Sequence, residues 1–480
     1  MVFNSIAFVI FFAVVCLLLL LTELSRVKRA CGNGIRTVRH WILVLASYIF
    51  YGWWDWRFTL LMLAMSLVAY FSALMFEKNK KKIYVTIGVA VPLIVLGIFK
   101  YFNFFVESFS RLFGLESPGA LAIILPVGIS FYTFQSLSYT IDVYRKTIPA
   151  EKSFLRLALY ISFFPQLVAG PIVKAADFLP QLDENRNISL KNFESGIQYF
   201  VFGLFKKIVL ADNISVCVDA VFSAPERYRS ISVLLAVIGY SIQIYCDFSG
   251  YSDMAIGCAK CLGYDLMKNF NIPYFSKNIS EFWNRWHISL SSWLKEYLYI
   301  PLGGNRKGPR RTYINLFLTM LLGGLWHGAA WTFVAWGGIH GVALCIHKLW
   351  MRITGHTKHH RGTAIGNIVS GMMTYAVVLV GWIFFRAPDF AIAGKVLNAL
   401  IHSQPGILYI SPWVIAGIVI VLSFSIGALI HSKKKGTALE GFYPCLNLNT
   451  VFGLTVFFVI LGIALGLAYT YSNPFIYFQF

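Results

Sequence analysis

The chain has 480 residues, of which 58% are hydrophobic and 13% are charged. Because soluble domains are about a quarter charged, this composition excludes a soluble protein and indicates a polytopic membrane protein. The net charge of +20 does not indicate nucleic-acid binding, since lysine and arginine collect in the cytoplasmic loops of such proteins and fix their orientation.

Apolar runs long enough to span a bilayer recur along the chain, and alternating strand-like segments are absent. The sequence therefore predicts an all-α membrane protein whose helices, and not a barrel, span the bilayer. Residues 3–21 lack preceding basic residues and a following small-residue cleavage site, so we expect a first transmembrane helix and not a cleaved signal. The next runs cover residues 41–54, 58–76, 83–99 and 120–144.

Two runs in the middle of the chain are interrupted. Residues 154–173 carry Pro165 and a Gly170-Pro171 pair, which predict a re-entrant or broken segment. Residues 196–222 carry Lys206 and Lys207, which indicate either a bend near the membrane surface or lysines that extend to that surface.

The later runs cover residues 231–262, 312–331, 332–350, 365–385, 413–430 and 451–471, and the mixed segment 268–311 is expected on the cytoplasmic side. With about 12 crossings, every Lys/Arg cluster falls on one side of the membrane. We therefore expect about 11–13 transmembrane helices with re-entrant and amphipathic pieces. They form one domain over residues 1–480, with a catalytic core near residues 95–350 and C-terminal helices over residues 365–480.

One histidine, His327, lies in a segment without any charged residue, from Thr312 to His340. A titratable ring in hydrocarbon is costly and marks a functional site by default. Gly323 and Gly324 precede it on the same helical face and predict a notch through which a substrate approaches the ring. The alternative is a core histidine that is hydrogen-bonded to a neighbouring helix.

Residues 280–300 predict one amphipathic helix with two faces. The apolar stripe comprises Phe282, Trp286, Leu290, Trp293 and Tyr297; the polar face comprises Asn284, His287, Ser291 and Lys295. Glu281 and Arg285 are spaced to form an ion pair. The helix lies either at the membrane surface or with His287 facing a polar cavity inside the bundle.

Two carboxylates, Asp247 and Asp253, lie in an otherwise apolar run, and such groups need partners. Helical spacing places Asp247 on one face with Gln243 and Tyr251, and Asp253 on another face with Ser249. Asp247 either pairs with Arg285 or Lys207, or orients a catalytic histidine.

A glycine-rich basic turn covers residues 301–311 and includes Gly303, Gly304, Asn305, Arg306 and Arg310. It lacks the phosphate-loop pattern, so it indicates no nucleoside triphosphate site. It is either a cytoplasmic loop that sets orientation or a site for the phosphates of a carrier such as coenzyme A.

No metal site is expected. His356, His359 and His360 are spaced like ligands, but no Cys, Asp or Glu accompanies them in their basic loop, which predicts a solvated loop. Cys258 and Cys261 lack a second pair, and no disulfide framework is evident. His340 and His347 are expected to pack in the core or at the membrane surface. Two intramembrane histidines without metal ligands favour general-base catalysis on a hydroxyl or nucleophilic attack on an activated acyl group.

These motifs resemble the membrane-bound O-acyltransferase (MBOAT) family, and most closely its bacterial alginate O-acetylation branch. The matching blocks include Gly-Gly-Leu-Trp-His-Gly at residues 323–328 and Phe-Trp-Asn-Arg-Trp-His at residues 282–287. The other blocks lie at residues 99–104, 125–132, 169–171, 247–255, 302–306 and 475–480.

The resemblance implies that His327 is the essential catalytic histidine and that His287 occupies a second, variable Asn/His position, where it orients or polarises a thioester carbonyl. Supporting residues are then Asp247, Ser249, Tyr251, Asp253, Asn284, Arg285 and Trp326. The implied fold is a ring of tilted helices around a thin centre, with a cytoplasmic and an extracytoplasmic funnel.

The resemblance also implies a multi-pass protein of the bacterial cytoplasmic (inner) membrane without a bound cofactor. The implied acyl donor is acetyl coenzyme A, and the acetyl group passes to an extracytoplasmic SGNH-type acetyltransferase that modifies a polysaccharide. The first alternative is D-alanyl transfer toward teichoic acid from a small acidic carrier protein, which the basic turn would attract. The second is a non-enzymatic transporter with polar residues along its path.

Overall fold

The computed structural model describes residues 1–24, 34–116, 119, 121, 123–168, 170–184, 186, 188–355, 363–435, 446–467 and 475. Within these ranges the regular elements are helices, beside one isolated bridge between Tyr228 and Ile407. Among the described residues, five helical segments are long and apolar enough to cross a membrane: Arg57–Asn79, Lys82–Phe113, Ser230–Cys261, Ala364–Arg386 and Pro412–Lys433. The prediction of an all-α, polytopic membrane protein is confirmed; the full number of crossings and the ring with two funnels stay predictions.

The chain divides into two compact units. Unit 1 comprises Met1–Val201 and Tyr251–Met267, and unit 2 comprises Phe202–Gly250 and Lys268–Phe480. The division falls inside two helices, α11 (Leu190–Phe205) and α13 (Ser230–Cys261). That all 480 residues act as one catalytic domain stays a prediction.

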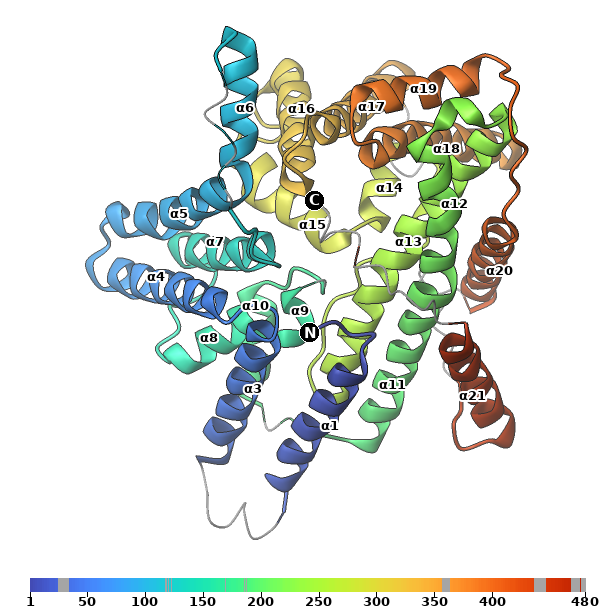
Figure 1. Ribbon diagram of the computed structural model, residues 1–480. Helices are drawn as coiled ribbons and strands as arrows, with labels where there is room; N and C mark the ends of the chain where they lie inside the picture. The colour runs from blue at the N-terminus through green and yellow to red at the C-terminus, as the bar shows by residue number, and fades with distance from the viewer. Residues whose placement is uncertain are drawn as a thin grey trace. The chain divides into compact units, whose positions relative to one another are not determined.

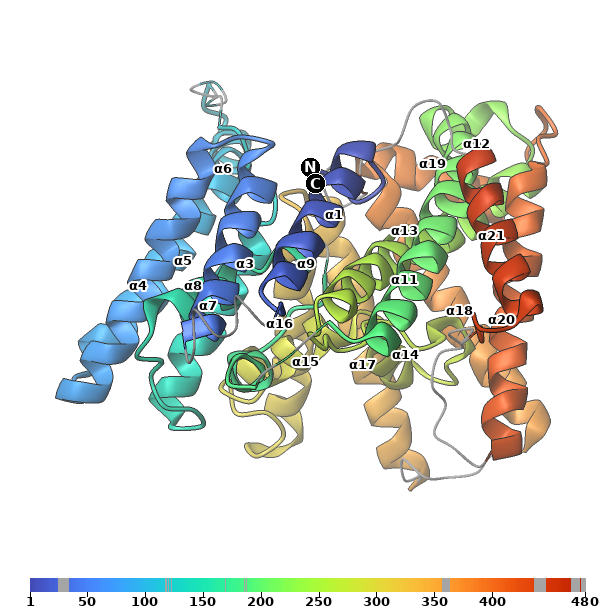
Figure 2. The same cartoon turned by 90° about the horizontal axis from the view of Figure 1, so that it is seen from below.

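Unit 1 contains a layer of long helices and several short ones (Figures 1 and 2). Its elements are α1 (Ile6–Leu21), α3 (Ile35–Gly52), α4 (Arg57–Asn79), α5 (Lys82–Leu96), η2 (Gly97–Tyr101), α6 (Phe102–Phe113), α7 (Ile129–Arg145), α8 (Phe154–Ser162), α9 (Phe164–Leu167), α10 (Ala175–Phe178) and η3 (Leu179–Leu182), together with most of α11 and the last part of α13. Helices α4, α5 and α7 pack closely because Gly88 has no side chain: a Cβ there would lie 2.8 Å from both Ser72 and Thr140.

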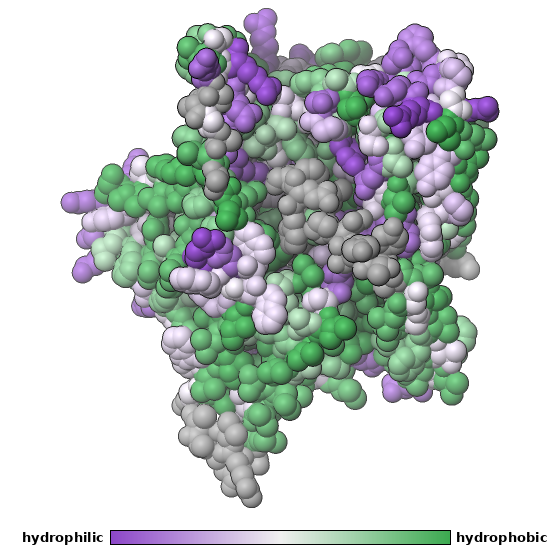
Figure 3. Space-filling model, in the orientation of Figure 1, coloured by the Kyte–Doolittle hydropathy of each residue, from purple (hydrophilic) through white to green (hydrophobic). Residues whose placement is uncertain are grey.

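The outer surface of α4 and α5 is apolar, and hydrophilic side chains gather at the ends of these helices (Figure 3). The exposed apolar residues are Phe71, Met75, Ile83, Ile87, Leu93 and Ile94. Lysines 78, 80, 81 and 82 are exposed at the turn that joins the two helices. An apolar flank with a basic end is typical of helices in contact with lipid.

The predicted break in residues 154–173 is confirmed. Helix α8 ends at Ser162 and α9 begins at Phe164, with Pro165 in its first turn. The side chain of Gln166 donates a hydrogen bond to the carbonyl of Tyr160 over 2.6 Å, and Ser47 Oγ accepts from the backbone N–H of Phe164 over 3.1 Å. Side chains thus satisfy the backbone groups that the break frees, as an apolar environment requires.

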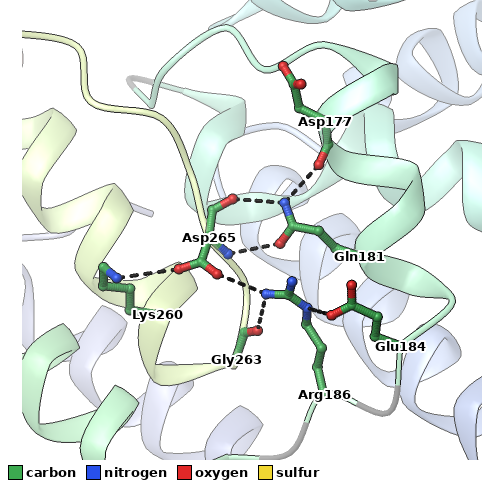
Figure 4. A network of polar contacts seen from close by, with 7 residues as sticks. All are labelled: Asp177, Gln181, Glu184, Arg186, Lys260, Gly263 and Asp265. Carbon is green, nitrogen blue, oxygen red and sulfur yellow. Dashed lines mark hydrogen bonds and ion pairs between the residues drawn. The ribbon is translucent and has the colours of Figure 1, made fainter.

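A polar network ties the C-terminal end of α13 to the segment before α11 (Figure 4). Gln181 accepts from the backbone N–H of Asp265 over 2.9 Å and donates to its carbonyl over 3.0 Å. Arg186 donates to the Asp265 carboxylate and to the carbonyl of Gly263, and Lys260 pairs with the same carboxylate. Burial alone would raise the pKa of Asp265, but the Arg186 hydrogen bond and the Lys260 charge outweigh burial and hold the pKa below its ordinary value.

Unit 2 holds the remaining helices. Its elements are η4 (Lys206–Ala211), α12 (Asp212–Ser223), η5 (Pro225–Arg227), η6 (Pro273–Phe275), α14 (Ile279–Arg285), α15 (Ile288–Leu294), η7 (Lys295–Tyr299), α16 (Gly308–His327), α17 (Trp331–Thr354), α18 (Ala364–Arg386), α19 (Phe390–Ile401), α20 (Pro412–Lys435) and α21 (Val451–Gly466), together with the first part of α13. Helices α16 and α17 form an antiparallel pair (Figure 1); α16 ends at His327, the histidine predicted from the sequence, and α17 begins four residues later.

Candidate active site

His327 is the last residue of α16, and only 3% of its surface is exposed. Three aromatic rings stand edge-on to it: Trp326 at 5.0 Å, Trp336 of α17 at 4.9 Å and Phe385 of α18 at 5.4 Å between ring centroids. Three helices therefore fix the ring in a largely apolar enclosure, as the uncharged surrounding sequence predicts.

The predicted open notch beside His327 is wrong. A Cβ on Gly324 would lie 2.3 Å from the carbonyl oxygen of Phe333, and a Cβ on Gly323 would lie 3.1 Å from Leu294. Gly328 is covered in the same way, because a Cβ there would lie 2.2 Å from the Phe333 ring. Gly324 and Gly328 allow α17 to pack closely against α16, and Gly323 leaves room for Leu294 of α15, which is the usual role of small residues between membrane helices.

The predicted continuous helix over residues 280–300 is also wrong. Helix α14 ends at Arg285, α15 begins at Ile288, and a wider turn, η7, follows from Lys295. His287 lies at the first break with φ 42° and ψ 56°. The left-handed conformation costs about 1–2 kcal/mol for a residue with a Cβ. Because it interrupts the helix at His287, residues before and after this position no longer share faces at helical spacing.

Hydrogen bonds to the side chain of Asn269 hold the buried ring of His287 in place. The backbone N–H of Ser289 donates to Asn269 Oδ1 over 3.2 Å, which identifies that atom as the amide oxygen. His287 Nδ1 lies 3.1 Å from the same oxygen and must therefore carry the hydrogen, so a neutral ring presents Nε2 as an acceptor. Phe248 packs edge-on against this ring at 4.6 Å. We did not predict Asn269 or Phe248, because neither belongs to a periodic pattern with His287.

Unit 2 brings His287 and His327 together, with ring centroids 6.4 Å apart. Trp326 contacts both rings, at 6.2 Å and 5.0 Å. Two imidazoles at this separation are able to serve one small reacting group, one as base or nucleophile and the other as a hydrogen-bonding partner.

The carboxylate of Asp247 belongs to a buried ionic cluster. Lys207 Nζ lies 2.6 Å from Asp247 Oδ1 and 2.7 Å from Asp212 Oδ1, and all three side chains are 2–3% exposed. The predicted pairing of Asp247 with Lys207 is confirmed, while Arg285 pairs with Glu281, as its spacing also predicts. Lys207 lies in the wide helical turn η4, where its side chain is buried.

This ionic cluster anchors the turn of α13 that contacts His287, since Phe248 follows Asp247 directly. A buried ion pair contributes little net stability but fixes geometry, and leaving one member alone is costly. Asp212, which the sequence pattern did not single out, completes the cluster.

The other predicted supporting residues lie on α13 and α14. Ser249 is buried on α13, whereas Asn284 is exposed on α14. Tyr251 and Asp253 are buried in unit 1. Apart from Trp326, whose ring contacts both histidines, the supporting roles of these residues stay predictions.

The basic turn adopts a conformation that its glycines permit. Gly303 and Gly304 have φ values of 111° and 53°, and Asn315 of α16 donates to the Gly304 carbonyl over 3.0 Å. Asn305 and Arg306 are exposed on the turn, and Arg310 is exposed in the first turn of α16. A role of these residues in donor binding stays a prediction. Within the described ranges no group of three His, Cys, Asp or Glu side chains is arranged to hold a metal, and His356, His359 and His360 lie outside those ranges.

The fold and the site define a multi-pass membrane protein with two buried, adjacent imidazoles. Residues 49–386 match the MBOAT, membrane-bound O-acyltransferase family, and the chain belongs to that family. It is therefore an O-acyltransferase, and the resemblance stated from the sequence is confirmed.

Three named relatives are similar to this chain. The chain is 42% identical over 370 residues to the probable alginate O-acetylase of Pseudomonas putida, which covers 75% of this chain and 74% of that protein. It is 38% identical over 389 residues to the peptidoglycan O-acetyltransferase of Helicobacter pylori, which covers 75% and 73%. It is 27% identical over 277 residues to the teichoic acid D-alanyltransferase of Bacillus subtilis, which covers 55% and 69%.

Proposed function

We propose that this O-acyltransferase moves an acetyl group from cytoplasmic acetyl coenzyme A across the bacterial inner membrane for O-acetylation of an extracellular or cell-wall polysaccharide. The observation that carries the proposal is the pairing of His327 with His287, 6.4 Å apart, inside a chain whose relatives at 38–42% identity are named as O-acetylating enzymes. The acetyl group reaches the polymer through an extracytoplasmic SGNH-type acetyltransferase partner.

In this proposal His327 is the general base. It takes the proton of the acceptor hydroxyl as the oxygen attacks the thioester carbonyl, the C–O bond forms, the C–S bond breaks, and the proton passes to the leaving thiolate. Such proton transfer contributes about 10²–10⁴-fold to the rate. A transiently acylated His327 is the second version of the same assignment.

The hydrogen bonds around His287 bear on its proposed role, which is to orient or to polarise the thioester carbonyl. A neutral ring that donates from Nδ1 to Asn269 has no hydrogen on Nε2, which supports an orienting role over polarisation. It is suited instead to accept a hydrogen bond from the attacking hydroxyl and to orient that group toward the thioester.

Replacing His287 by alanine is expected to lower acetylation about 10-fold, less than any change at His327, because orientation is lost while the base remains. Asn269→Ala should produce a loss of similar size. The double variant should be no less active than either single variant, since both changes remove the same hydrogen bond between His287 and Asn269. Polymer-bound acetate per cell measures all three. An unchanged rate in His287→Ala would make this residue structural.

The alternative of D-alanyl transfer is favoured by the D-alanyltransferase relative and by the exposed Arg306 and Arg310, which would attract an acidic carrier protein. Family membership sets the non-enzymatic transporter aside. The two enzymatic functions differ in their donor.

Reconstituted vesicles separate the two functions. Labelled acetyl coenzyme A, or a carrier protein charged with labelled D-alanine, is supplied on one side, and the polysaccharide with its partner acetyltransferase on the other. We expect the polymer to become labelled when acetyl coenzyme A is the donor and to stay unlabelled when the charged carrier protein is the donor. Transfer from the charged carrier alone would replace the proposal by the alternative.

A further inference from the structure

Exposed lysines gather at one end of helices α4, α5 and α7 in unit 1. The six lysines of this lysine cluster lie where α4 turns into α5 and in the segment after α7: Lys78, Lys80, Lys81, Lys82, Lys146 and Lys152. The two groups are adjacent, because the rings of Phe76 near the end of α4 and Tyr144 near the end of α7 have centroids 5.4 Å apart. Glu77 of α4 also accepts from the backbone N–H of Ala150 over 3.2 Å, which ties the segment after α7 to α4.

The lysine cluster carries positive charge that the protein leaves uncompensated. Within the described ranges, none of the six ammonium groups forms an ion pair with a carboxylate. The acidic residues that flank them in sequence are engaged elsewhere or buried: Glu77 holds Ala150, Glu151 pairs with Arg156 over 3.0 Å, and Asp142 is buried. The cluster is therefore suited to an anionic partner outside the chain.

Two of these lysines adopt a conformation that lysine disfavours. Lys80 ends α4 with φ 56° and ψ 14°, and Lys146 ends α7 with φ 62° and ψ 26°. In the part of the chain that the structure describes, four residues other than glycine have a positive φ, and these lysines are two of them. A side chain in this left-handed region costs free energy that glycine avoids, so glycine is the usual residue at such a helix end.

Helix α6 shows the glycine form of the same helix end. Gly114 closes α6 with φ 62° and ψ 25°, and its backbone N–H and the next one donate to carbonyls of the last turn. Lys146 and the residue after it make the same two hydrogen bonds at the end of α7. Glycine would close α7 in the same way, so the lysine adds a charge that the helix end does not need. Strain of this kind at two neighbouring helix ends indicates a function.

The surroundings of the lysine cluster identify the partner. Phe71, Met75 and Ile83 are exposed on the helices that carry the lysines, and apolar and hydrophilic areas adjoin at the left edge of the surface in Figure 3. Tyr144 is exposed at the same helix ends, as is typical of residues at a membrane surface. With the apolar flank in hydrocarbon, the ammonium groups lie at the level of the lipid headgroups. About four to eight cationic side chains in that position attract anionic lipids.

We propose that the lysine cluster binds the headgroups of anionic phospholipids, with Lys80 and Lys146 at its centre. The ligand is a phosphodiester headgroup with a net negative charge, such as that of phosphatidylglycerol, in the leaflet on the side of the membrane predicted to be cytoplasmic. This property goes beyond the proposed function and does not depend on it, since the lysines belong to unit 1 and both site histidines belong to unit 2.

Native mass spectrometry of the purified full-length protein in neutral detergent tests the proposal. The probes are phosphatidylglycerol and phosphatidylcholine with identical acyl chains, so the ratio of their binding constants reports the headgroup preference alone. The unmodified protein should prefer phosphatidylglycerol. Lys80→Gly combined with Lys146→Gly should lower that preference about fivefold for each lysine removed. The same variant should not lower the thermal midpoint, because glycine relieves both left-handed helix ends.

Three further variants are matched controls. Lys80→Arg combined with Lys146→Arg keeps both charges and should retain the preference. Lys191→Gln combined with Lys307→Gln removes the same charge from exposed positions outside the lysine cluster and should not change the preference. Gly114→Lys places a left-handed lysine at the end of α6, where an added Cβ meets nothing within 4 Å, and should lower the thermal midpoint.

The outcomes decide the proposal without reference to acetylation. An unchanged preference in the double glycine variant would overturn it, and so would an equal loss in the Lys191 and Lys307 control, which would assign the effect to net charge. The glycine variant is also compared with the unmodified protein on glycerol 3-phosphate and on an acidic acyl carrier protein. Weaker binding of either probe, with phosphatidylglycerol binding unchanged, would replace the lipid by a free phosphate or a protein.

Discussion

Replacement of His327 by alanine or glutamine is expected to lower polymer acetylation by about 10²–10⁴-fold, to the background of cells without the enzyme. Glutamine fills most of the space among Trp326, Trp336 and Phe385 and keeps a hydrogen-bonding end, but it does not take up a proton. The measurement is ester-bound acetate per mass of polymer, in cells with equal amounts of each variant in the membrane.

His347→Gln is the matched control, since it makes the same substitution at a partly exposed position of α17 and should leave acetylation unchanged. Substantial acetylation by both His327 variants would contradict the assignment of the base. Equal loss in His347→Gln would show that the assay reports membrane insertion and not chemistry.

Replacement of Lys207 by methionine is expected to reduce the free energy of unfolding by about 3–5 kcal/mol, because it leaves the carboxylates of Asp212 and Asp247 buried without their cation. Acetylation should fall as well, since Phe248, next to Asp247, loses its anchor beside His287. Reversible denaturation in mixed micelles measures the stability.

The neighbouring residue supplies the control for Lys207. Lys206 is only partly buried and lies 5.9 Å over the Tyr245 ring, so Lys206→Met should cost less than about 1 kcal/mol. Adding Asp212→Asn and Asp247→Asn to Lys207→Met should recover part of the lost stability, because the uncompensated charges are gone. Equal unfolding energies for the two single methionine variants would contradict the ionic cluster.

Much of the fold follows from local sequence. Long apolar runs predict membrane helices because only a helix satisfies its own backbone in lipid, and Pro165 predicts a break because proline cannot continue a helix. The pairing of Lys207 with Asp247 was also predictable, since a buried charge requires a partner of opposite sign.

The geometry of the site was less predictable, for two physical reasons. Helical spacing across residues 280–300 assumes a continuous helix, and nothing in a histidine indicates the left-handed conformation that His287 adopts. The partner that sets the hydrogen position on this ring, Asn269, lies 18 residues earlier in a segment without periodicity.

Gly323 and Gly324 illustrate a further ambiguity. A glycine on a membrane helix permits close approach by either a ligand or another helix, and its own sequence context does not distinguish the two. The structure shows that other helices fill the space beside these glycines: Leu294 of α15 lies beside Gly323, and Phe333 and Gly337 of α17 lie beside Gly324.

The network around Asp265 has a consequence for synthesis in the cell. Unit 1 is discontinuous, because Tyr251–Met267 completes what Met1–Val201 begins. Gln181 and Arg186 emerge from the ribosome about 80 residues before their partner, 84 and 79 positions ahead of Asp265 respectively. At about 5–20 residues per second, these side chains wait several seconds for Asp265 while α11, η4, α12 and α13 are made. Unit 1 therefore cannot complete this polar network until the whole of α13 has been made.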